Sequence, residues 1–202
     1  MSAPGGPAVL FDVDGTLVDS NYLQVIAWTE AFRSVGHAFD SWRVHRRIGM
    51  GSAQLLESLL GDEAARLGER ASAEHTRYYH DAFDQLKPLA GARELLHSVA
   101  ELGLQVVLAT SAEPDELDRL RQVLDADEAI TSVVGSDDVE TAKPAPDLVG
   151  VALERAGCTV EQAIFVDATV WDVRAAGAVA IYDDAAQLLT ELANNPIAAL
   201  TS

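Results

Sequence analysis

Two aspartates separated by one residue stand directly after an apolar run near the start of the chain. The run Ala8–Phe11 predicts a short buried strand, and Asp12-Val13-Asp14-Gly15-Thr16 follows it. If the chain turns at Gly15, both carboxylates face one pocket, where one can attack a substrate while the other transfers protons. Carboxylates this close resist joint ionisation unless a cation offsets their charge, and their oxygens suit a hard cation, Mg²⁺ foremost. An ordinary Asp-Gly turn explains the same residues, so the motif alone does not establish a site.

Residues that could bind a phosphate or a metal ion follow the later apolar runs. Run 104–110 ends on Thr110-Ser111, whose hydroxyls bind phosphate oxygens or cap a helix. Lys143, in a proline-rich turn, offers a compact positive charge for a phosphate unless it is simply a surface lysine. Asp167 ends the run Ala163–Val166, and Asp172 follows; both are further oxygen ligands for Mg²⁺ or helix caps. Each signal is weak alone, but together they recur in order at successive strand ends, which favours a site.

The elements that must position these residues follow from the apolar pattern. Runs 8–11, 104–110, 130–134, 163–167 and 178–182 predict strands, and helical stripes lie between the later ones. Alternating strands and helices are typical of an α/β fold with a parallel, Rossmann-like sheet, whose sites lie at the carboxyl ends of the strands. The helical stripes are Leu95, Leu96, Val99 and Leu102; Leu117, Leu120 and Leu124; and Leu148, Val149, Ala152, Leu153 and Ala156.

The stretch between the first and second strands is entirely helical in its pattern. We therefore expect an all-helical cap domain at 19–86, inserted into a core domain made of 1–18 and 87–202. Its stripes are Val25, Trp28, Phe32 and Val35; Leu55, Leu56, Leu59 and Leu60; and Leu67, Ala71, Tyr78 and Ala82.

Bulk properties narrow the class of protein. The chain has 202 residues, 49% of them hydrophobic, and a formal charge of −18, which disfavours nucleic acid and anionic membranes as partners. A single cysteine, Cys158, excludes an internal disulfide or a multi-cysteine metal site. We see neither a signal peptide nor a membrane-spanning stretch, and expect a cytoplasmic monomer or homodimer acting on a small phosphorylated metabolite.

With these residues in view, the sequence resembles the haloacid dehalogenase superfamily, in the branch of phosphoglycolate phosphatase-like and β-phosphoglucomutase-like proteins. Four signatures carry the resemblance: Phe11-Asp12-Val13-Asp14-Gly15-Thr16-Leu17, Thr110, Lys143-Pro144 with Asp147, and Asp167 with Asp172. It covers nearly the whole chain, including the helical cap.

The resemblance implies a Mg²⁺-dependent phosphatase of small organic phosphate monoesters. Asp12 would become phosphorylated, and Asp14 would protonate the leaving oxygen and then activate water. Thr110 and Lys143 would hold the phosphoryl group. Asp12, the backbone carbonyl of Asp14 and Asp167 would hold Mg²⁺, with Asp172 as an outer ligand. The presence of Asp14 favours phosphate chemistry over carbon–halogen cleavage.

Two alternatives to the phosphatase stay open, and the sequence departs from the family pattern at two places. Val166 replaces a usual glycine, which would displace Asp167 if the backbone there needed a positive φ. After Ala176 the sequence lacks one strand unit of the family pattern. These two departures keep open the alternative of a catalytically impaired phosphate-binding protein. A β-phosphoglucomutase-like sugar phosphomutase is a second, separate alternative. In the cap, one of His45, Arg46 and Arg47 either reaches the site to meet an anionic substrate group or lies at a solvated helix end.

Overall fold

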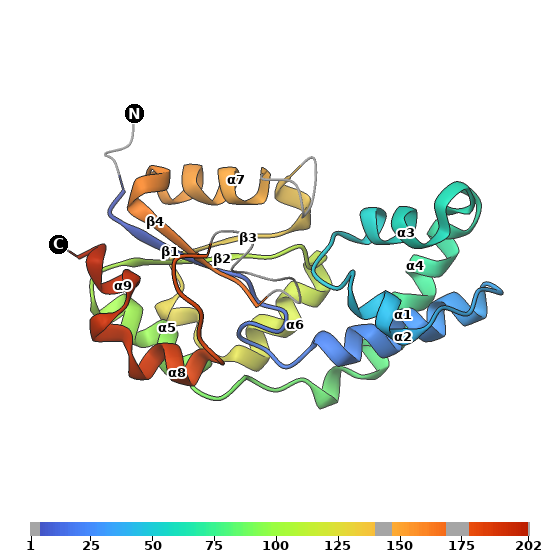
Figure 1. The fold of residues 1–202 in the computed structure, drawn as a ribbon, viewed down its shortest axis with the longest axis horizontal. Coiled ribbons are helices and arrows are strands. Elements are labelled where there is room, and N and C mark those ends of the chain that lie inside the picture. Colours follow the sequence, from blue (N-terminus) through green and yellow to red (C-terminus); the bar gives the residue numbers. More distant parts are fainter. Residues whose placement is uncertain (1–4, 140–146, 169–177, 202) are drawn as a thin grey trace.

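A parallel sheet forms the centre of the protein, seen here in a computed structural model that describes residues 5–139, 147–168 and 178–201 (Figure 1). Its four strands are β1 (Ala8–Phe11), β2 (Gln105–Ala109), β3 (Ser132–Val134) and β4 (Ala163–Val166), in the order β3-β2-β1-β4. Phe11 pairs with Leu108 of β2 and with Val166 of β4. The carboxyl ends of the three strands therefore lie level at one edge of the sheet, as expected for an α/β fold.

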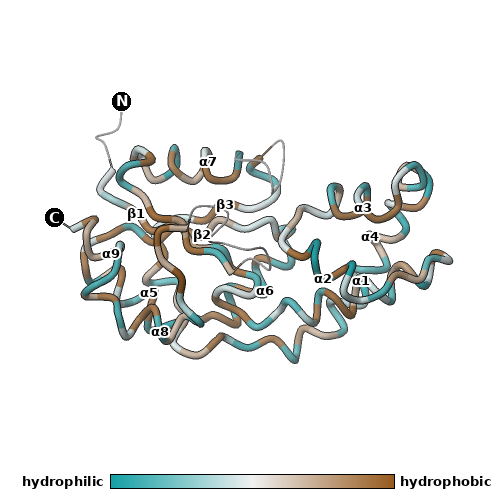
Figure 2. The backbone as a smooth tube through the Cα atoms, in the orientation of Figure 1, coloured by the Kyte–Doolittle hydropathy of each residue, from teal (hydrophilic) through white to brown (hydrophobic). Residues whose placement is uncertain are grey.

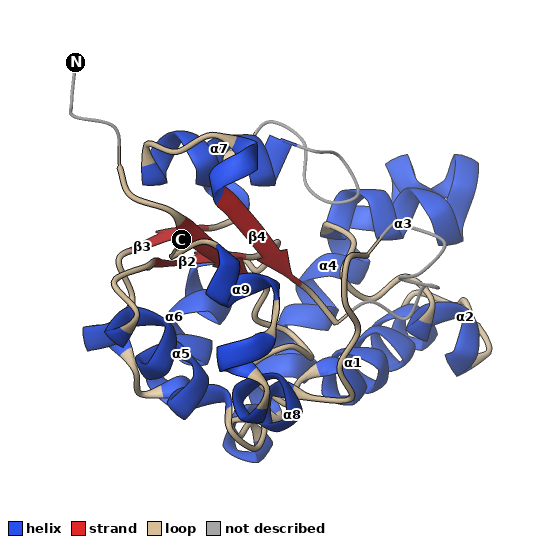
Figure 3. Cartoon of the chain, turned by 60° about the vertical axis from the view of Figure 1, so that its left-hand side comes forward, coloured by secondary structure: helices blue, strands red, loops and turns tan. Residues whose placement is uncertain are grey.

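Helices cover both faces of this sheet, as Figure 3 shows from a second direction. Alternate side chains of β1 point to opposite faces: Val9 and Phe11 belong to one hydrophobic cluster, and Ala8 and Leu10 to another. Figure 2 shows the strands as hydrophobic along most of their length. The first cluster includes residues of α5 (Ala92–Glu101), α6 (Pro114–Leu124), α8 (Ala185–Thr190) and α9 (Pro196–Ala199), and the second includes residues of α7 (Asp147–Ala156).

The segment between β1 and β2 is helical, as the sequence predicts. It forms α1 (Asn21–Ser34), α2 (Ser41–His45), α3 (Ser52–Leu60) and α4 (Ala64–Asp81), which extend to one side of the sheet (Figure 1). A separate hydrophobic cluster, which includes Trp28 and Phe32, packs between these helices. On α4 the predicted apolar stripe is wrong at its C-terminal end. The sequence predicts that Tyr78 and Ala82 are buried, but the structure buries His75 and Tyr79 instead.

Two segments of the chain, 17–19 and 87–89, connect these helices to the sheet, and they lie side by side. Val18 bridges Pro88, the Asp19 N–H donates to the Lys87 carbonyl at 2.9 Å, and the Leu89 N–H donates to the Leu17 carbonyl at 2.9 Å. On this basis we propose the division into a core of 1–18 and 87–202 and a cap of 19–86.

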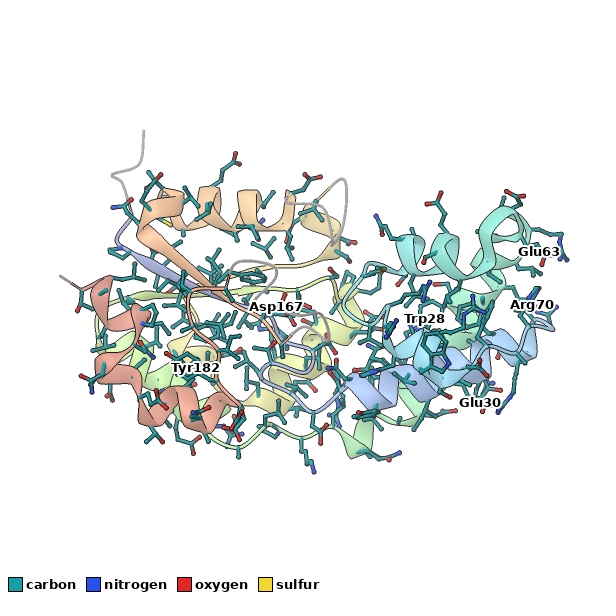
Figure 4. The ribbon with its side chains drawn as sticks, viewed as in Figure 1. Trp28, Glu30, Glu63, Arg70, Asp167 and Tyr182 are labelled. Carbon is teal, nitrogen blue, oxygen red and sulfur yellow. The ribbon has the colours of Figure 1, made fainter. Side chains whose placement is uncertain are left out.

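The fifth predicted strand, 178–182, is not a strand. Val179 is 81% exposed and Ile181 42% exposed, and only Tyr182, labelled in Figure 4, packs against the first cluster. A strand exists only where a neighbour pairs with it, and an apolar pattern carries no information about that neighbour. Along the described ranges, no helix has both the length and the apolar character needed to cross a membrane.

Candidate functional site

A tight loop after β1 turns the two aspartates toward the same side. The Val13 carbonyl accepts N–H groups from Thr16, Leu17 and Val18, while the Val13 side chain is fully buried. Gly15 has φ +74°, and a Cβ there would lie 2.0 Å from Asn21 Nδ2, so a side chain would strain the turn. With Val13 anchored in the core between them, Asp12 and Asp14 both line one pocket.

Asp12 is held by the hydroxyl of Thr16. The carboxylate is 6% exposed, and its Oδ2 accepts a hydrogen bond from Thr16 Oγ1 at 3.2 Å. The same hydroxyl oxygen accepts the Ala168 N–H at 2.8 Å, which connects the loop after β1 to the loop after β4. A single buried threonine therefore positions both strand ends at this edge of the sheet.

Asp14 is oriented from the first turn of the cap. Ser20 is fully buried at the start of α1, and its Oγ donates to Asp14 Oδ1 at 2.6 Å. A hydrogen bond this short fixes the direction of the carboxyl group.

Thr110 and Ser111 end β2 on the same pocket. Thr110 is 1% exposed, and its Oγ1 accepts the Ala112 N–H at 3.1 Å. Ser111 Oγ is buried and has no hydrogen-bond partner among the described residues, although it lines the pocket. An unsatisfied buried hydroxyl facing a cavity is suited to bind an oxygen-rich ligand.

The pocket lies between the sheet and the cap and encloses about 480 Å³, including space open to solvent. The core contributes Asp12, Asp14, Thr110, Ser111, Ala112 and Glu116; the cap contributes Gln24, Trp28, Ile48, Gly49, Met50, Ser52, Leu55 and His75. Figure 4 labels Trp28 on the cap side and Asp167 at the end of β4. The cap therefore forms much of the wall around the two aspartates.

Three polar residues on this wall were not singled out from the sequence. His75 is 4% exposed, stacks on Trp28 with ring centroids 4.0 Å apart, and donates from Nε2 to Gln24 Oε1 at 2.7 Å. Glu116, in the first turn of α6, is 6% exposed. The one sequence signal for His75 and Gln24 is a polar residue on an otherwise apolar helix face, which does not name a partner.

Burial shifts the protonation of these groups. Burial, and then the charges of Asp14 and Glu113, raise the pKa of Glu116 to about 8, although hydrogen bonds from the Glu113 backbone and from the Gln24 side chain offset part of the rise. Burial lowers the pKa of His75 to about 3, so its ring is neutral at pH 7. Burial and the nearby Asp14 and Glu116 also raise the pKa of the Tyr79 hydroxyl. Such displaced pKa values are typical of functional pockets.

Two of the carboxylates predicted to bind Mg²⁺ follow the paired strands β1 and β4. The Asp12 N–H donates to the Val166 carbonyl at 2.9 Å, so Asp12 and Asp167 follow neighbouring, paired strands. Within the described ranges no three His, Cys, Asp or Glu side chains cluster as a metal cage. Mg²⁺ is commonly held by one or two carboxylates together with substrate phosphate and water, so this pair fits it.

The structure bears differently on two predicted site residues, Lys143 and Asp172, and on the predicted effect of Val166 on Asp167. Lys143 and Asp172 lie outside the described residues, so their roles stay predictions. Val166 is an ordinary strand residue paired with Phe11, and Asp125 is the one non-glycine residue with positive φ among those described. The backbone before Asp167 therefore does not require glycine.

The basic residues His45, Arg46 and Arg47 of the cap do not line the pocket. The His45 ring stacks on Tyr22, and the Arg46 guanidinium lies over the Trp42 ring, 5.2 Å from its centroid. Arg47 donates from Nε to Ser58 Oγ at 2.6 Å. None of the three lines the pocket, so the structure favours the helix-end interpretation.

Comparison with known proteins identifies the family of this chain. Residues 7–180 match the family model described as haloacid dehalogenase-like hydrolase. The chain is 31% identical over 182 residues to the phosphorylated carbohydrates phosphatase of Thermotoga maritima, covering 86% of this chain and 82% of the relative. It is 26% identical to the phosphoglycolate phosphatase of Escherichia coli, covering 84% and 77%. A solved hydrolase from Pseudomonas syringae superposes with a TM-score of 0.86 at 30% identity, covering 92% of this chain and 97% of that one. The chain belongs to the haloacid dehalogenase-like hydrolase family.

Proposed function

We propose that this hydrolase is a Mg²⁺-dependent phosphatase that cleaves small organic phosphate monoesters through an aspartyl-phosphate on Asp12. The observation that carries the proposal is the shared pocket of Asp12 and Asp14, with Thr110 and the unsatisfied Ser111 hydroxyl on the same wall. A nucleophile, an acid/base group and hydroxyls for phosphate oxygens are the parts that phosphoryl transfer requires.

In the first step a carboxylate oxygen of Asp12 attacks phosphorus. The bond from phosphorus to the leaving-group oxygen breaks, and Asp14 gives that oxygen its proton. The Thr16 hydroxyl on Asp12 Oδ2 and the Ser20 hydroxyl on Asp14 Oδ1 hold the two carboxyl groups in place for this exchange. Thr110 and Ser111 bind the phosphoryl oxygens, and Lys143 adds positive charge.

In the second step Asp14, now ionised, takes a proton from water. The water oxygen attacks phosphorus, the bond to Asp12 breaks, and inorganic phosphate leaves with the Asp12 carboxylate restored. The cap helices over the pocket limit the access of bulk water, so that the ester and not free solvent meets Asp14 during the first step.

Asp12, Asp167 and the backbone carbonyl of Asp14 would hold the Mg²⁺, with Asp172 as an outer ligand. When bound, the ion supplies charge neutralisation between the carboxylates and the phosphoryl oxygens. The supporting observation is that the carboxylates follow paired residues of adjacent strands and offer oxygen donors alone.

The relatives support the same reaction class. One is named for hydrolysis of phosphorylated carbohydrates and another for hydrolysis of phosphoglycolate, and each aligns with more than four fifths of this chain, at 86% and 84%. Phosphate monoesters are the substrate class shared by both names.

Hydrolysis of an aryl phosphate tests the proposal. We expect phosphate release with Mg²⁺, none with a chelator, none in Asp12→Asn, and unchanged release in Asp115→Asn, which removes an exposed carboxylate of α6. Acid-quenched mass spectrometry of Asp14→Asn should find phosphate on Asp12. Full activity in Asp12→Asn would refute the mechanism, and interconversion of sugar phosphates without phosphate release would identify a mutase.

A further inference from the structure

A third carboxyl group, that of Glu116, lies on the pocket wall with the two aspartates. Its side chain is 6% exposed, and the charge of Asp14 acts on it more strongly than the charge of Glu113. Glu116 stands in the first turn of α6, the helix that follows the Thr110 end of β2. The two reaction steps described above use Asp12 and Asp14 and leave Glu116 without a role.

Hydrogen bonds from both sides fix the Glu116 carboxyl group. On the core side it accepts a hydrogen bond from the backbone of Glu113, the N-cap residue of α6. On the cap side it accepts one from the side chain of Gln24. The Gln24 amide is itself oriented, because its Oε1 accepts the His75 Nε2–H at 2.7 Å and its NH₂ group is left to donate to Glu116. Glu116 therefore has a fixed direction at the boundary between core and cap.

A helix-capping role does not explain why this carboxyl group is buried. A glutamate in the first turn that bonds to the N-cap backbone serves a helix equally well at an exposed position. Burying a carboxyl group beside a second one destabilises the fold: burial, and then the Asp14 charge, raise the pKa of Glu116. A destabilising group that lines the same pocket as the reacting residues is typical of a functional residue.

The second step of the proposed reaction needs a group with these properties. The attacking water must be held with a lone pair toward phosphorus, and Asp14 accepts only one of its two protons. A second hydrogen-bond acceptor fixes the other O–H bond, because a water held by one contact can rotate about it. A carboxyl group has an acceptor oxygen in both its ionised and its protonated form. Glu116 meets this requirement in either form.

We infer, on the basis of the proposed phosphatase activity, that Glu116 is a positioning residue that holds, together with Asp14, the water that hydrolyses the aspartyl-phosphate. The water oxygen forms its bond to phosphorus as the bond from phosphorus to Asp12 breaks, and one water proton passes to Asp14. The other O–H bond stays intact and donates to Glu116, which neither gains nor loses a proton. The first step consumes no water, so its rate should depend little on Glu116.

Separate measurement of the two steps tests this inference. Rapid acid quench of the reaction with a radiolabelled aryl phosphate and Mg²⁺ gives the rate at which phosphorylated protein forms. A chase with unlabelled substrate gives the rate at which that protein is hydrolysed. Glu116→Met keeps the length of the side chain and removes its acceptor oxygens. It should slow hydrolysis by about tenfold or more and change formation by less than about threefold.

Two controls accompany this variant. Asp115→Asn, at the exposed neighbouring position on α6, should change neither rate. Glu116→Met removes a buried ionisable group, so in urea it should be no less stable than the unmodified protein at pH 8. Slower hydrolysis in a variant of equal or greater stability does not come from unfolding.

A competing alcohol gives a readout that a merely structural role for Glu116 would not change. Methanol has one O–H bond, so it can give its proton to Asp14 but cannot also donate to Glu116. Glu116→Met should therefore raise the ratio of methyl phosphate to inorganic phosphate formed by about fivefold or more. Glu116→Gln keeps one acceptor oxygen and should raise this ratio less. An unchanged ratio in Glu116→Met would refute the role in positioning water.

The inference and the proposed activity can fail separately. Phosphorylated protein that is hydrolysed equally fast in Glu116→Met and in the unmodified protein would refute the role of Glu116 and leave the phosphatase intact. Equal slowing of both steps would also refute that role, since it would show a general disturbance of the pocket. If the unmodified protein hydrolyses the ester but no phosphate is ever found on Asp12, the aspartyl-phosphate mechanism is refuted and the role of Glu116 with it.

Discussion

Replacing Glu116 by glutamine should make the protein more stable at pH 8 and leave its stability unchanged near pH 4. Glu116 is 6% exposed, and burial, followed by the charges of Asp14 and Glu113, raises its pKa to about 8 from an ordinary value of 4.5. Glutamine keeps the size of the side chain and removes its ionisation. The comparison therefore isolates what the buried carboxyl group costs when it is charged.

The sign follows from proton binding. Below about pH 4.5 Glu116 is protonated in both the folded and the unfolded chain, and contributes no difference. Between pH 4.5 and 8 the unfolded chain ionises while the folded protein stays protonated, so rising pH favours unfolding. Above pH 8 the penalty is complete, and the difference between the two pKa values corresponds to about 5 kcal/mol at most.

Urea unfolding from pH 4 to pH 9, without metal, measures this effect. Metal is left out because a cation would offset the Asp14 charge that helps to raise the Glu116 pKa. Glu116→Gln should gain several kcal/mol over the unmodified protein as pH rises through this range, approaching the limit of about 5 kcal/mol. Asp115→Asn, which removes an exposed carboxylate one residue earlier on α6, should show no such gain.

A parallel pH dependence in the unmodified protein and Glu116→Gln would refute the reasoning. It would mean that Glu116 ionises in the folded protein as it does in the unfolded chain, and that the pocket wall is solvated at this residue.

Three further outcomes follow from the site and the fold. Thr16→Val removes the hydroxyl on Asp12 Oδ2 and should lower kcat with an aryl phosphate about tenfold, by steady-state kinetics; an unchanged kcat would exclude a positioning role. Gly91 and Gly103 flank α5 with φ of +77° and +78°, but a Cβ at Gly91 would lie 2.8 Å from the backbone of α8, while nothing lies within 4 Å at Gly103. Gly103→Ala should cost about 1 kcal/mol in urea unfolding and Gly91→Ala about 1–3 kcal/mol more, and equal costs would contradict the contact. The ring signals of His75 should stay constant by NMR from pH 8 to pH 4, since burial lowers its pKa to about 3; a midpoint near 6.5 would show that the ring is solvated.

The sequence correctly predicted the features that depend on neighbours along the chain. Asp12 and Asp14 follow a strand and precede a glycine, and that local arrangement already implies a turn that presents both carboxylates. The order of strands and helices in the sheet core follows from apolar periodicity in the same way. The catalytic and metal-binding roles of these residues stay predictions, as does the division into core and cap.

Two predictions were wrong because they depend on contacts between segments that are distant in the sequence. The run 178–182 has the apolar residues of a strand, but no described strand pairs with it. On α4 the buried face continues through the polar His75, which an apolar stripe passes over. Pairing partners and buried polar contacts exist only between distant segments, so periodicity does not predict them.

What the sequence determined by itself is therefore the edge of the sheet that carries the two aspartates. Its strand and its turn at Gly15 depend on short-range sterics and hydrogen bonds, which the local sequence decides. What only the tertiary structure decided is the wall opposite. Gln24 and His75 are 51 residues apart, and Glu116 comes from another helix; they share a pocket because the cap packs over the sheet. The positions of His45, Arg46 and Arg47 outside the described pocket lining have the same origin, since each is held by a contact within the cap.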